Sequence, residues 1–238
     1  MKIRLVTLDL DDTLWDPYSQ LISAAELMRN WFAEHHPTLT GFLDDPEAQR
    51  QVRDAVIERS PELRTRLSSL RREVLKAGLK SAGYNPDEAQ AAADAGFSVF
   101  YRARSSGLAL FDGARELLRA LSARGALGAV SNGNADLKLM NLMPPFDFCA
   151  NPECAGVGKP DPEIFRYALD QAGCSADECV HIGDHPLYDV DGARGADIEP
   201  IWYNPGADPW RGEGPPPRTV THLNQVLDAL DRLEGEQR

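Results

Sequence analysis

The segment from Leu5 to Leu14 constrains this chain more than any other. It reads LVTLDLDDTL, an apolar run that passes directly into the acids Asp9, Asp11 and Asp12. A run with no polar face is typical of a strand buried on both sides, as in a parallel sheet. Like charges so close together raise one another's pKa unless a cation lies among them. Because ligands bind at the carboxyl ends of strands in open α/β sheets, the segment predicts a hard-cation site, with an acidic surface turn as the alternative.

The charge of the chain argues against two classes of partner. Among 238 residues, 37 acidic side chains outnumber 25 basic ones, which gives a net charge of −12. Nucleic acids and anionic membranes both require a basic face, so neither is expected as a partner. A small anionic substrate needs only a local positive pocket and stays compatible with this composition. No apolar run of the kind found in a secretory signal is present, so we expect a cytoplasmic protein.

Helical patterns dominate the first part of the chain after the acidic segment. Apolar residues recur at three- and four-residue steps from Tyr18. Proline-containing N-cap patterns at Asp45, Ser60 and Asn85 then predict three further helices, the second of them running to about residue 82. Residues 16–106 carry no strand signal, so we expect an inserted helical block.

The remaining segments alternate strands with helices. Four apolar runs predict strands at 126–130, 146–150, 179–182 and 198–203. Helices are expected between them, including a short one before residue 146 and one over 189–195, and the Pro- and Gly-rich stretch 204–218 reads as a surface loop. This alternation is typical of a parallel sheet with right-handed crossovers. We therefore expect an α/β fold, with a Rossmann-like parallel-sheet core formed by residues 1–15 and 107–238.

Polar residues follow four of the predicted strand ends. They are Asp9, Asp11 and Thr13; Ser131, Asn132 and Gly133; Lys159; and Asp184 with Asp189. In a parallel sheet these ends share one edge, so the residues are expected to converge. Carboxylates suit Mg²⁺, which takes one or two of them together with waters and a phosphate. Serine and the N–H groups of a Gly-containing turn suit phosphate oxygens, and lysine supplies a compact positive charge.

This arrangement resembles the four motifs of the haloacid dehalogenase superfamily. The motifs stand in the right order as Asp9-x-Asp11-x-Thr13, Ser131, Lys159-Pro160, and Gly183-Asp184 followed by Asp189. The helical block of residues 16–106 resembles the α-helical cap domain that many members insert after the first motif. The resemblance covers essentially the whole chain. Asp12 departs from it, because many members have glycine there, and Pro186 departs from it in the last motif.

Carried onto this chain, the resemblance implies a two-step phosphoryl transfer. Asp9 would be the nucleophile, forming an aspartyl-phosphate, and Asp11 would serve first as acid and then as base. Asp9, the main-chain carbonyl of Asp11, and Asp184 would hold Mg²⁺, and Asp189 would orient either metal-bound water or Lys159. The implied phosphate or substrate contacts are Thr13, Trp15, Ser131, Asn132, Gly133 and Lys159, of which Ser131 and Lys159 are also assigned to catalysis.

Individual residues keep other interpretations at this point. Trp15 is equally suited to stacking on a flat heterocycle and to core packing. Asp189 is also placed as a helix N-cap, and Lys159 as a solvated loop lysine. The roles of His185 and of the loop 204–218 are not assigned from sequence, although a plain surface loop is the default.

More narrowly, the chain resembles bacterial phosphatases that act on FMN and on phosphoribitylaminouracil, an intermediate of riboflavin biosynthesis. The features are Asp11-Asp12-Thr13-Leu14, His36-Pro37 and Ser131-Asn132-Gly133-Asn134. A phosphatase for another small metabolite, such as a nucleotide or sugar phosphate, and a non-catalytic module that binds a phosphorylated metabolite or a protein are the alternatives. A dehalogenase is disfavoured, because those enzymes need neither an acid at the Asp11 position nor Mg²⁺. We expect a monomer or a homodimer.

Overall fold

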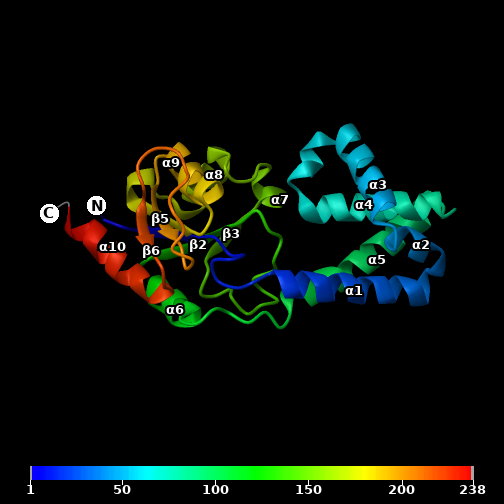
Figure 1. Cartoon of the computed structure of the whole chain (residues 1–238), viewed down its shortest axis with the longest axis horizontal. Helices are drawn as coiled ribbons and strands as arrows, with labels where there is room; N and C mark the ends of the chain where they lie inside the picture. Colours follow the sequence, from blue (N-terminus) through cyan, green and yellow to red (C-terminus); the bar gives the residue numbers. More distant parts are fainter. Residues whose placement is uncertain (1, 237–238) are drawn as a thin grey trace. The chain divides into compact units, whose positions relative to one another are not determined.

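The chain forms two compact units. The computed structural model describes residues 2–236 (Figure 1). The α/β unit contains residues 2–16, 109–133 and 141–236, and the helical unit contains residues 17–108 and 134–140. The short second segment was not expected in the helical unit. It belongs there because Asn134 Nδ2 donates to Ser68 Oγ at 2.9 Å and the Asp136 N–H donates to Ser105 Oγ at 3.0 Å.

A parallel sheet organises the α/β unit, as predicted. Its order is β3-β2-β1-β4-β5-β6. The strands are β1 (Leu5–Leu8), β2 (Ala126–Val130), β3 (Phe148–Ala150), β4 (Cys179–Gly183), β5 (Glu199–Tyr203) and β6 (Arg218–Val220). The apolar β1 lies between β2 and β4, with Leu8 opposite Ala129 and Ile182. The edge strand β6 was not predicted, because three residues after a loop are too short to show a pattern.

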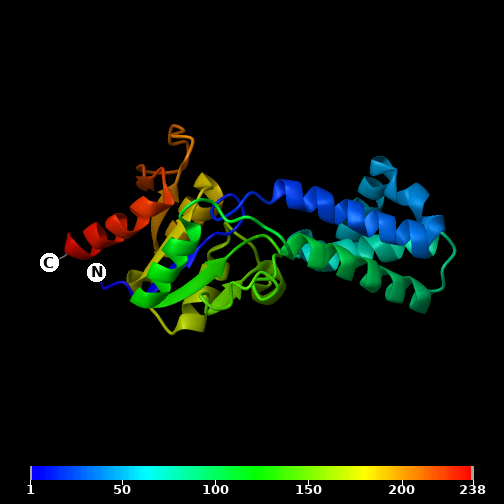
Figure 2. The same ribbon diagram turned by 90° about the horizontal axis from the view of Figure 1, so that it is seen from below.

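Helices cover both faces of the sheet (Figures 1 and 2). The helices α6 (Ala114–Arg124) and α10 (Val226–Gly235) lie on one face, and α8 (Pro162–Ala172) and α9 (Gly192–Gly195) lie on the other. Ile164 and Phe165 of α8 are fully buried in a cluster with Leu5 and Val130 of the sheet. Burying a side chain of this size contributes about 1.5–3 kcal/mol, so this layer holds the sheet from which the site projects.

The helical unit begins with α1, and most of its helix starts agree with the sequence. Its elements are α1 (Tyr18–His35), η1 (Pro37–Leu39), α2 (Thr40–Leu43), α3 (Pro46–Arg59), η2 (Pro61–Arg64), α4 (Leu67–Ser81) and α5 (Pro86–Ser105). Asp45 caps α3, and Asn85 with Glu88 forms the predicted capping box of α5. The prediction for Ser60 was wrong. Its side chain makes no cap bond and only a 3₁₀ turn follows, so α4 starts seven residues later.

Two helix predictions for the segments that follow β2 and β4 also need correction. No helix of the described chain lies between β2 and β3. There the Asp136 carboxylate caps a single turn through the N–H groups of Lys138 and Leu139, and two prolines follow at 144 and 145. The helix predicted over 189–195 is instead a π-helical turn, η4 (Pro186–Asp191), followed by α9.

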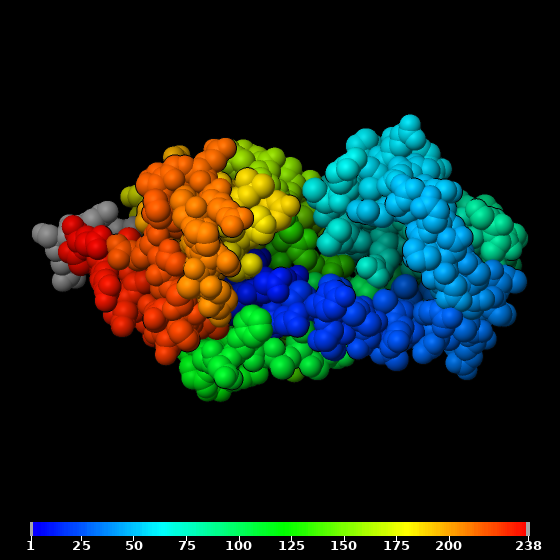
Figure 3. Space-filling view, in the orientation of Figure 1, coloured from blue at the N-terminus to red at the C-terminus, as the bar shows by residue number. Residues whose placement is uncertain are grey.

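Short elements complete the fold. They are α7 (Pro152–Ala155), η3 (Ala176–Glu178) and η5 (Leu223–Gln225). The Pro- and Gly-rich segment 204–217, orange in Figure 3, runs over the surface of the α/β unit. Among the helices described, none combines the length and the apolar character needed to cross a membrane.

Candidate active site

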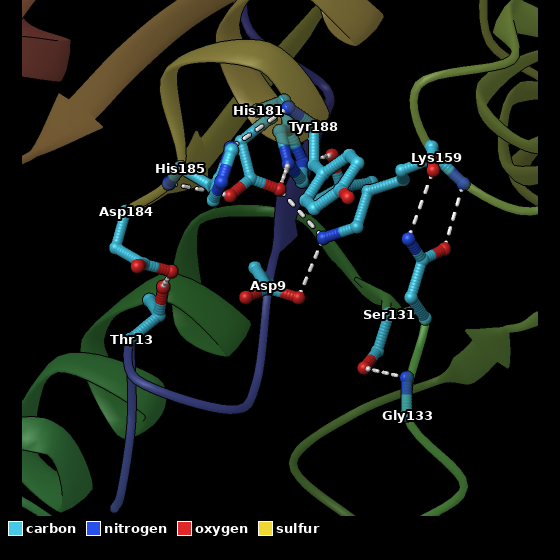
Figure 4. A network of polar contacts seen from close by, with 12 residues as sticks. Asp9, Thr13, Ser131, Gly133, Lys159, His181, Asp184, His185 and Tyr188 are labelled. Carbon is cyan, nitrogen blue, oxygen red and sulfur yellow. Dashed lines mark hydrogen bonds and ion pairs between the residues drawn. The ribbon is translucent and has the colours of Figure 1, made fainter. Parts of the chain in front are cut away.

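The carboxyl ends of β1, β2 and β4 bring the predicted polar residues together. Figure 4 shows Asp9 after β1, Ser131 after β2 and Asp184 after β4 around a common centre. The pairing of β1 with β4 continues one residue past the strand, since the Asp9 N–H donates to the Ile182 carbonyl at 2.8 Å. The nucleophile candidate is therefore fixed by the sheet itself.

Lys159 links two carboxylates inside the unit. Its Nζ lies 2.6 Å from Asp9 Oδ1 and 2.5 Å from Asp189 Oδ1. The side chains of Lys159 and Asp189 are only 3% and 2% exposed, so these ion pairs are almost free of solvent. Interpreting Lys159 as a solvated loop lysine is therefore wrong.

Asn132 holds the backbone of Lys159 in place. Its Oδ1 accepts the Lys159 N–H at 2.7 Å, and its Nδ2 donates to the Lys159 carbonyl at 2.9 Å. A Cβ at Gly158 would lie 2.8 Å from Asn132 Oδ1, so glycine allows this close approach. Ser131 Oγ accepts the Gly133 N–H at 2.9 Å, which shapes the turn beside it.

Three carboxylates crowd around this single ammonium group. Asp9, Asp184 and Asp189 each place one oxygen within 4.8 Å of the others. Asp189 is already engaged, because Oδ1 meets Lys159 and His181 while Oδ2 accepts the His185 N–H at 2.9 Å. Among the described residues, nothing donates to Oδ2 of Asp9 or of Asp184. These two oxygens are thus the ones available to a cation, and an all-oxygen donor set suits a hard divalent ion.

The pKa shifts express the same excess of negative charge. Burial, together with the Asp189 carboxylate, holds the pKa of Asp9 well above its ordinary value, although Lys159 opposes this. Burial and repulsion from Asp189 and Asp12 raise the pKa of Asp184 to about 6. Burial would also raise the pKa of Asp189, but Lys159 and His181 lower it. A cation between Asp9 and Asp184 would relieve the first two shifts, so the residues present fit a bound metal.

Three of the predicted substrate contacts make other interactions in this structure. Thr13 is fully buried and its Oγ1 donates to Asp184 Oδ1 at 3.2 Å. Trp15 is also fully buried, and its Nε1 donates to Asp11 Oδ1 at 2.8 Å, so its ring offers no face for stacking. Asn132 contacts the Lys159 backbone. Each therefore orients another site residue, and the direct contact of Thr13 and Asn132 with substrate stays a prediction.

Asp12 stands at a backbone position that usually favours glycine. Its φ is +63°, in the left-handed region that aspartate tolerates better than most residues. Its N–H donates to the Trp15 carbonyl at 2.8 Å, which closes the turn that carries Asp11. The departure from the family pattern at this position is therefore structurally accommodated.

Sequence reasoning missed two residues that contact the site. His181, in the middle of β4, is fully buried against Asp189. Trp202, on β5, donates its Nε1–H to the Asp184 carbonyl at 2.6 Å. The only available signal was a histidine within an apolar strand two residues before Gly183. His185, whose role was open, caps η4, because its Nδ1 accepts the N–H groups at 187 and 188.

The loop after β5 also reaches the site, contrary to the default expectation of a plain surface loop. A cavity of about 690 Å³ in the α/β unit is lined by Asp184 and by six residues of the loop, which are Asn204, Pro205, Gly206, Asp208, Pro209 and Arg211. Phe111 and Trp202 supply apolar surface, and Arg211 supplies a positive charge. The loop is therefore a wall of the space next to the acidic cluster.

Comparisons with known proteins agree with this geometry. A family model described as haloacid dehalogenase-like hydrolase matches residues 3–197. The chain is 28% identical over 204 residues to the 5-amino-6-(5-phospho-D-ribitylamino)uracil phosphatase YigB of Escherichia coli, covering 86% of this chain and 84% of that one. It is 33% identical over 163 residues to a phosphoserine phosphatase of Thermus thermophilus, covering 66% and 64%. A crystal structure titled 2-haloacid dehalogenase, from Pseudomonas syringae pv. Tomato, is 38% identical with a TM-score of 0.91, covering 97% and 99%.

Proposed function

The chain belongs to the haloacid dehalogenase-like hydrolase family, and from that premise we propose that it hydrolyses phosphate monoesters through an aspartyl-phosphate on Asp9. The observation that supports this most is the buried Asp9 paired with Lys159 beside two further carboxylates. A carboxylate can approach a phosphate dianion only where positive charge lies between them. Two relatives named as phosphatases support the same reaction.

In the first step, an Asp9 oxygen attacks the phosphorus while the bond to the ester oxygen breaks. Asp11 gives its proton to the leaving alkoxide and then takes a proton from the water that cleaves the aspartyl-phosphate. The Trp15 N–H orients Asp11 for both transfers. Ser131 and Lys159 bind phosphate oxygens, and Lys159 neutralises the nucleophile before the attack.

We propose Mg²⁺ as the metal, held by Asp9 and Asp184 with the main-chain carbonyl of Asp11. When bound, it supplies the positive charge that screens the nucleophile from the phosphate. The oxygen-only donors and the raised pKa values of Asp9 and Asp184 support this choice. Asp189, with both oxygens engaged, holds Lys159 instead of the metal.

For the substrate we propose a small phosphomonoester, with phosphoribitylaminouracil or FMN of riboflavin biosynthesis first. The Escherichia coli relative, named for the first of these compounds, supports this choice at 28% identity. A phosphoserine-like ester is the next choice, since the Thermus thermophilus relative is named for that activity. The cytoplasmic location and the monomeric or homodimeric state stay predictions.

Hydrolytic dehalogenation of a 2-haloacid is the second candidate. The Pseudomonas syringae structure favours it, because its title names that activity at 38% identity. The electrostatics favour phosphatase chemistry: three carboxylates face one lysine, and a haloacid brings a further negative charge without a metal to offset it.

One panel separates these candidates. Phosphate release is measured from FMN, phosphoribitylaminouracil, phosphoserine and sugar phosphates, and halide release from 2-chloropropionate, with Mg²⁺ or with EDTA. We expect Mg²⁺-dependent phosphate release that Asp9→Asn abolishes, together with an acid-labile phosphate on wild-type Asp9. Halide release without phosphate release would establish the second candidate. No turnover of any compound, and no phosphorylated Asp9 with a small phosphoryl donor, would favour a binding module.

A further inference from the structure

A chain of polar contacts runs through the interior of the α/β unit beneath the acidic cluster. Thr7 Oγ1 lies 2.9 Å from His181 Nδ1, and His181 Nε2 lies 3.1 Å from Asp189 Oδ1 (Figure 4 shows the second contact). Thr7 is 1% exposed and His181 has no exposed surface. His181 therefore reaches neither solvent nor substrate.

The chain of contacts closes on the strand where it begins. Asp189 Oδ1 also meets Lys159 Nζ at 2.5 Å, and the same Nζ meets Asp9 Oδ1 at 2.6 Å. Thr7 and Asp9 are two residues apart at the end of β1, so their side chains point to the same side. Five residues on four segments are thus linked by four polar contacts, and the backbone of residues 7–9 closes them into a ring that contains the nucleophile candidate.

The chemistry of the partners fixes which nitrogen of His181 carries a hydrogen. Asp189 is a carboxylate and can only accept, so His181 Nε2 must carry the hydrogen. His181 Nδ1 is then an acceptor, and the Thr7 hydroxyl donates to it. Burial keeps the pKa of His181 below its ordinary value, which agrees with a neutral ring. The His181 ring packs against Phe165 in a T-shaped contact, with ring centres 4.9 Å apart and planes at 81°.

We propose that His181 is a positioning residue, which holds Asp189 Oδ1 in the orientation that keeps the Lys159 ammonium group on Asp9. This inference rests on the proposed function of Asp9 and Lys159. Asp189 has three donors: the His181 ring, the Lys159 ammonium group and the His185 N–H. Without the ring N–H, the remaining backbone donor, the His185 N–H, holds Oδ2, and Oδ1 keeps only its contact with Lys159. Lys159 would then follow Asp189 away from Asp9, although no substrate contact is lost.

Two substitutions at His181 test the role. His181→Leu fills the buried position with an apolar side chain and removes the donor, whereas His181→Gln keeps an N–H donor near the position of Nε2. With the best ester of the panel, we expect kcat of His181→Leu to fall at least tenfold with KM within twofold, and His181→Gln to recover most of the loss. Equal losses in the two variants, or wild-type kcat per folded molecule in His181→Leu, would overturn the proposal.

Thr7→Val keeps the test decisive if His181→Leu does not fold. It removes the hydroxyl that donates to Nδ1, which is also hydrogen-bonded to the buried Cys179 thiol, and we expect a two- to fivefold fall in kcat with KM unchanged. A rise in KM alone would count against positioning. In wild-type protein, ¹⁵N NMR of labelled histidine should show His181 as the neutral Nε2–H tautomer, and the Nδ1–H tautomer would refute the ring. The NMR result does not need turnover, so it separates failure of this inference from failure of the proposed function.

Discussion

Replacing Asp184 with asparagine should stabilise the metal-free protein at neutral pH while it abolishes turnover. Asp184 is partly buried next to Asp189 and Asp12, and burial with their repulsion raises its pKa from 3.8 to about 6. Asparagine keeps the oxygen that accepts the Thr13 hydroxyl, so the substitution removes charge with little change of shape. The lost function follows from the loss of a proposed metal ligand.

The magnitude follows from the pKa. The folded protein holds the proton of Asp184 more firmly than the unfolded chain does, so this stabilisation is complete below about pH 3.8 and is lost as the pH rises through about 6. At about 1.36 kcal/mol for each pH unit, the loss amounts to about 3 kcal/mol. This is an upper value, because some solvent screens a partly exposed carboxylate. Asparagine never ionises, so the variant does not suffer the loss.

Urea unfolding in EDTA between pH 4 and pH 7.5 measures this difference. We expect similar free energies of unfolding at pH 4, and a variant more stable by up to about 3 kcal/mol at pH 7.5. Saturating Mg²⁺ should then stabilise the wild type and leave the variant unchanged. Asp170→Asn, an exposed site on α8, is the matched control. A variant less stable than wild type at pH 7.5, or a difference that does not depend on pH, would refute the reasoning.

Two further substitutions probe the neighbours of the nucleophile candidate. Lys159→Met leaves the carboxylates of Asp9 and Asp189 buried without their ammonium partner, so we expect a loss of about 3–5 kcal/mol in urea unfolding at pH 7.5. Turnover should fall at least about 10²-fold, and unchanged stability would contradict the charge distribution described. Trp15→Phe removes the N–H that orients Asp11 and keeps most of the ring, so we expect about tenfold lower kcat with little change in KM. A change confined to KM would show instead that the ring contacts substrate.

The sequence was sufficient for the parts of the fold that depend on local pattern. The apolar run of β1, the alternation of strands and helices, and the caps at Asp45 and Asn85 all appear in the structure. The prediction of a helix start at Ser60 failed. A serine followed by a proline can precede a 3₁₀ turn as well as an α-helix, and here Pro61–Arg64 form a 3₁₀ turn. The sequence also failed at β6 because a three-residue edge strand carries too little pattern.

The residues of the site also fall into a group that the sequence predicts and a group that it does not. Residues with a charge at a strand end, such as Asp9 and Asp184, were predictable, because strand ends meet at one edge of a parallel sheet. The partners that orient them were not predictable. His181 contacts Asp189 because the π-helical turn η4 brings Asp189 back over β4. Trp202 contacts Asp184 from the neighbouring strand β5. Such contacts depend on the path of the chain between elements, which residue type and spacing do not encode.

The central place of β1 has a consequence for how the chain is made. Both neighbours of β1 lie far along the chain, the nearer one starting at Ala126. At a synthesis rate of about 5–20 residues per second, this apolar strand waits roughly 6–24 s on the ribosome before a partner emerges. The helices of residues 17–108 are complete before then and can fold from local contacts. The order of the sheet thus makes Leu5–Leu8, which directly precedes the nucleophile candidate, the one strand of the described sheet that leaves the ribosome before any partner strand exists.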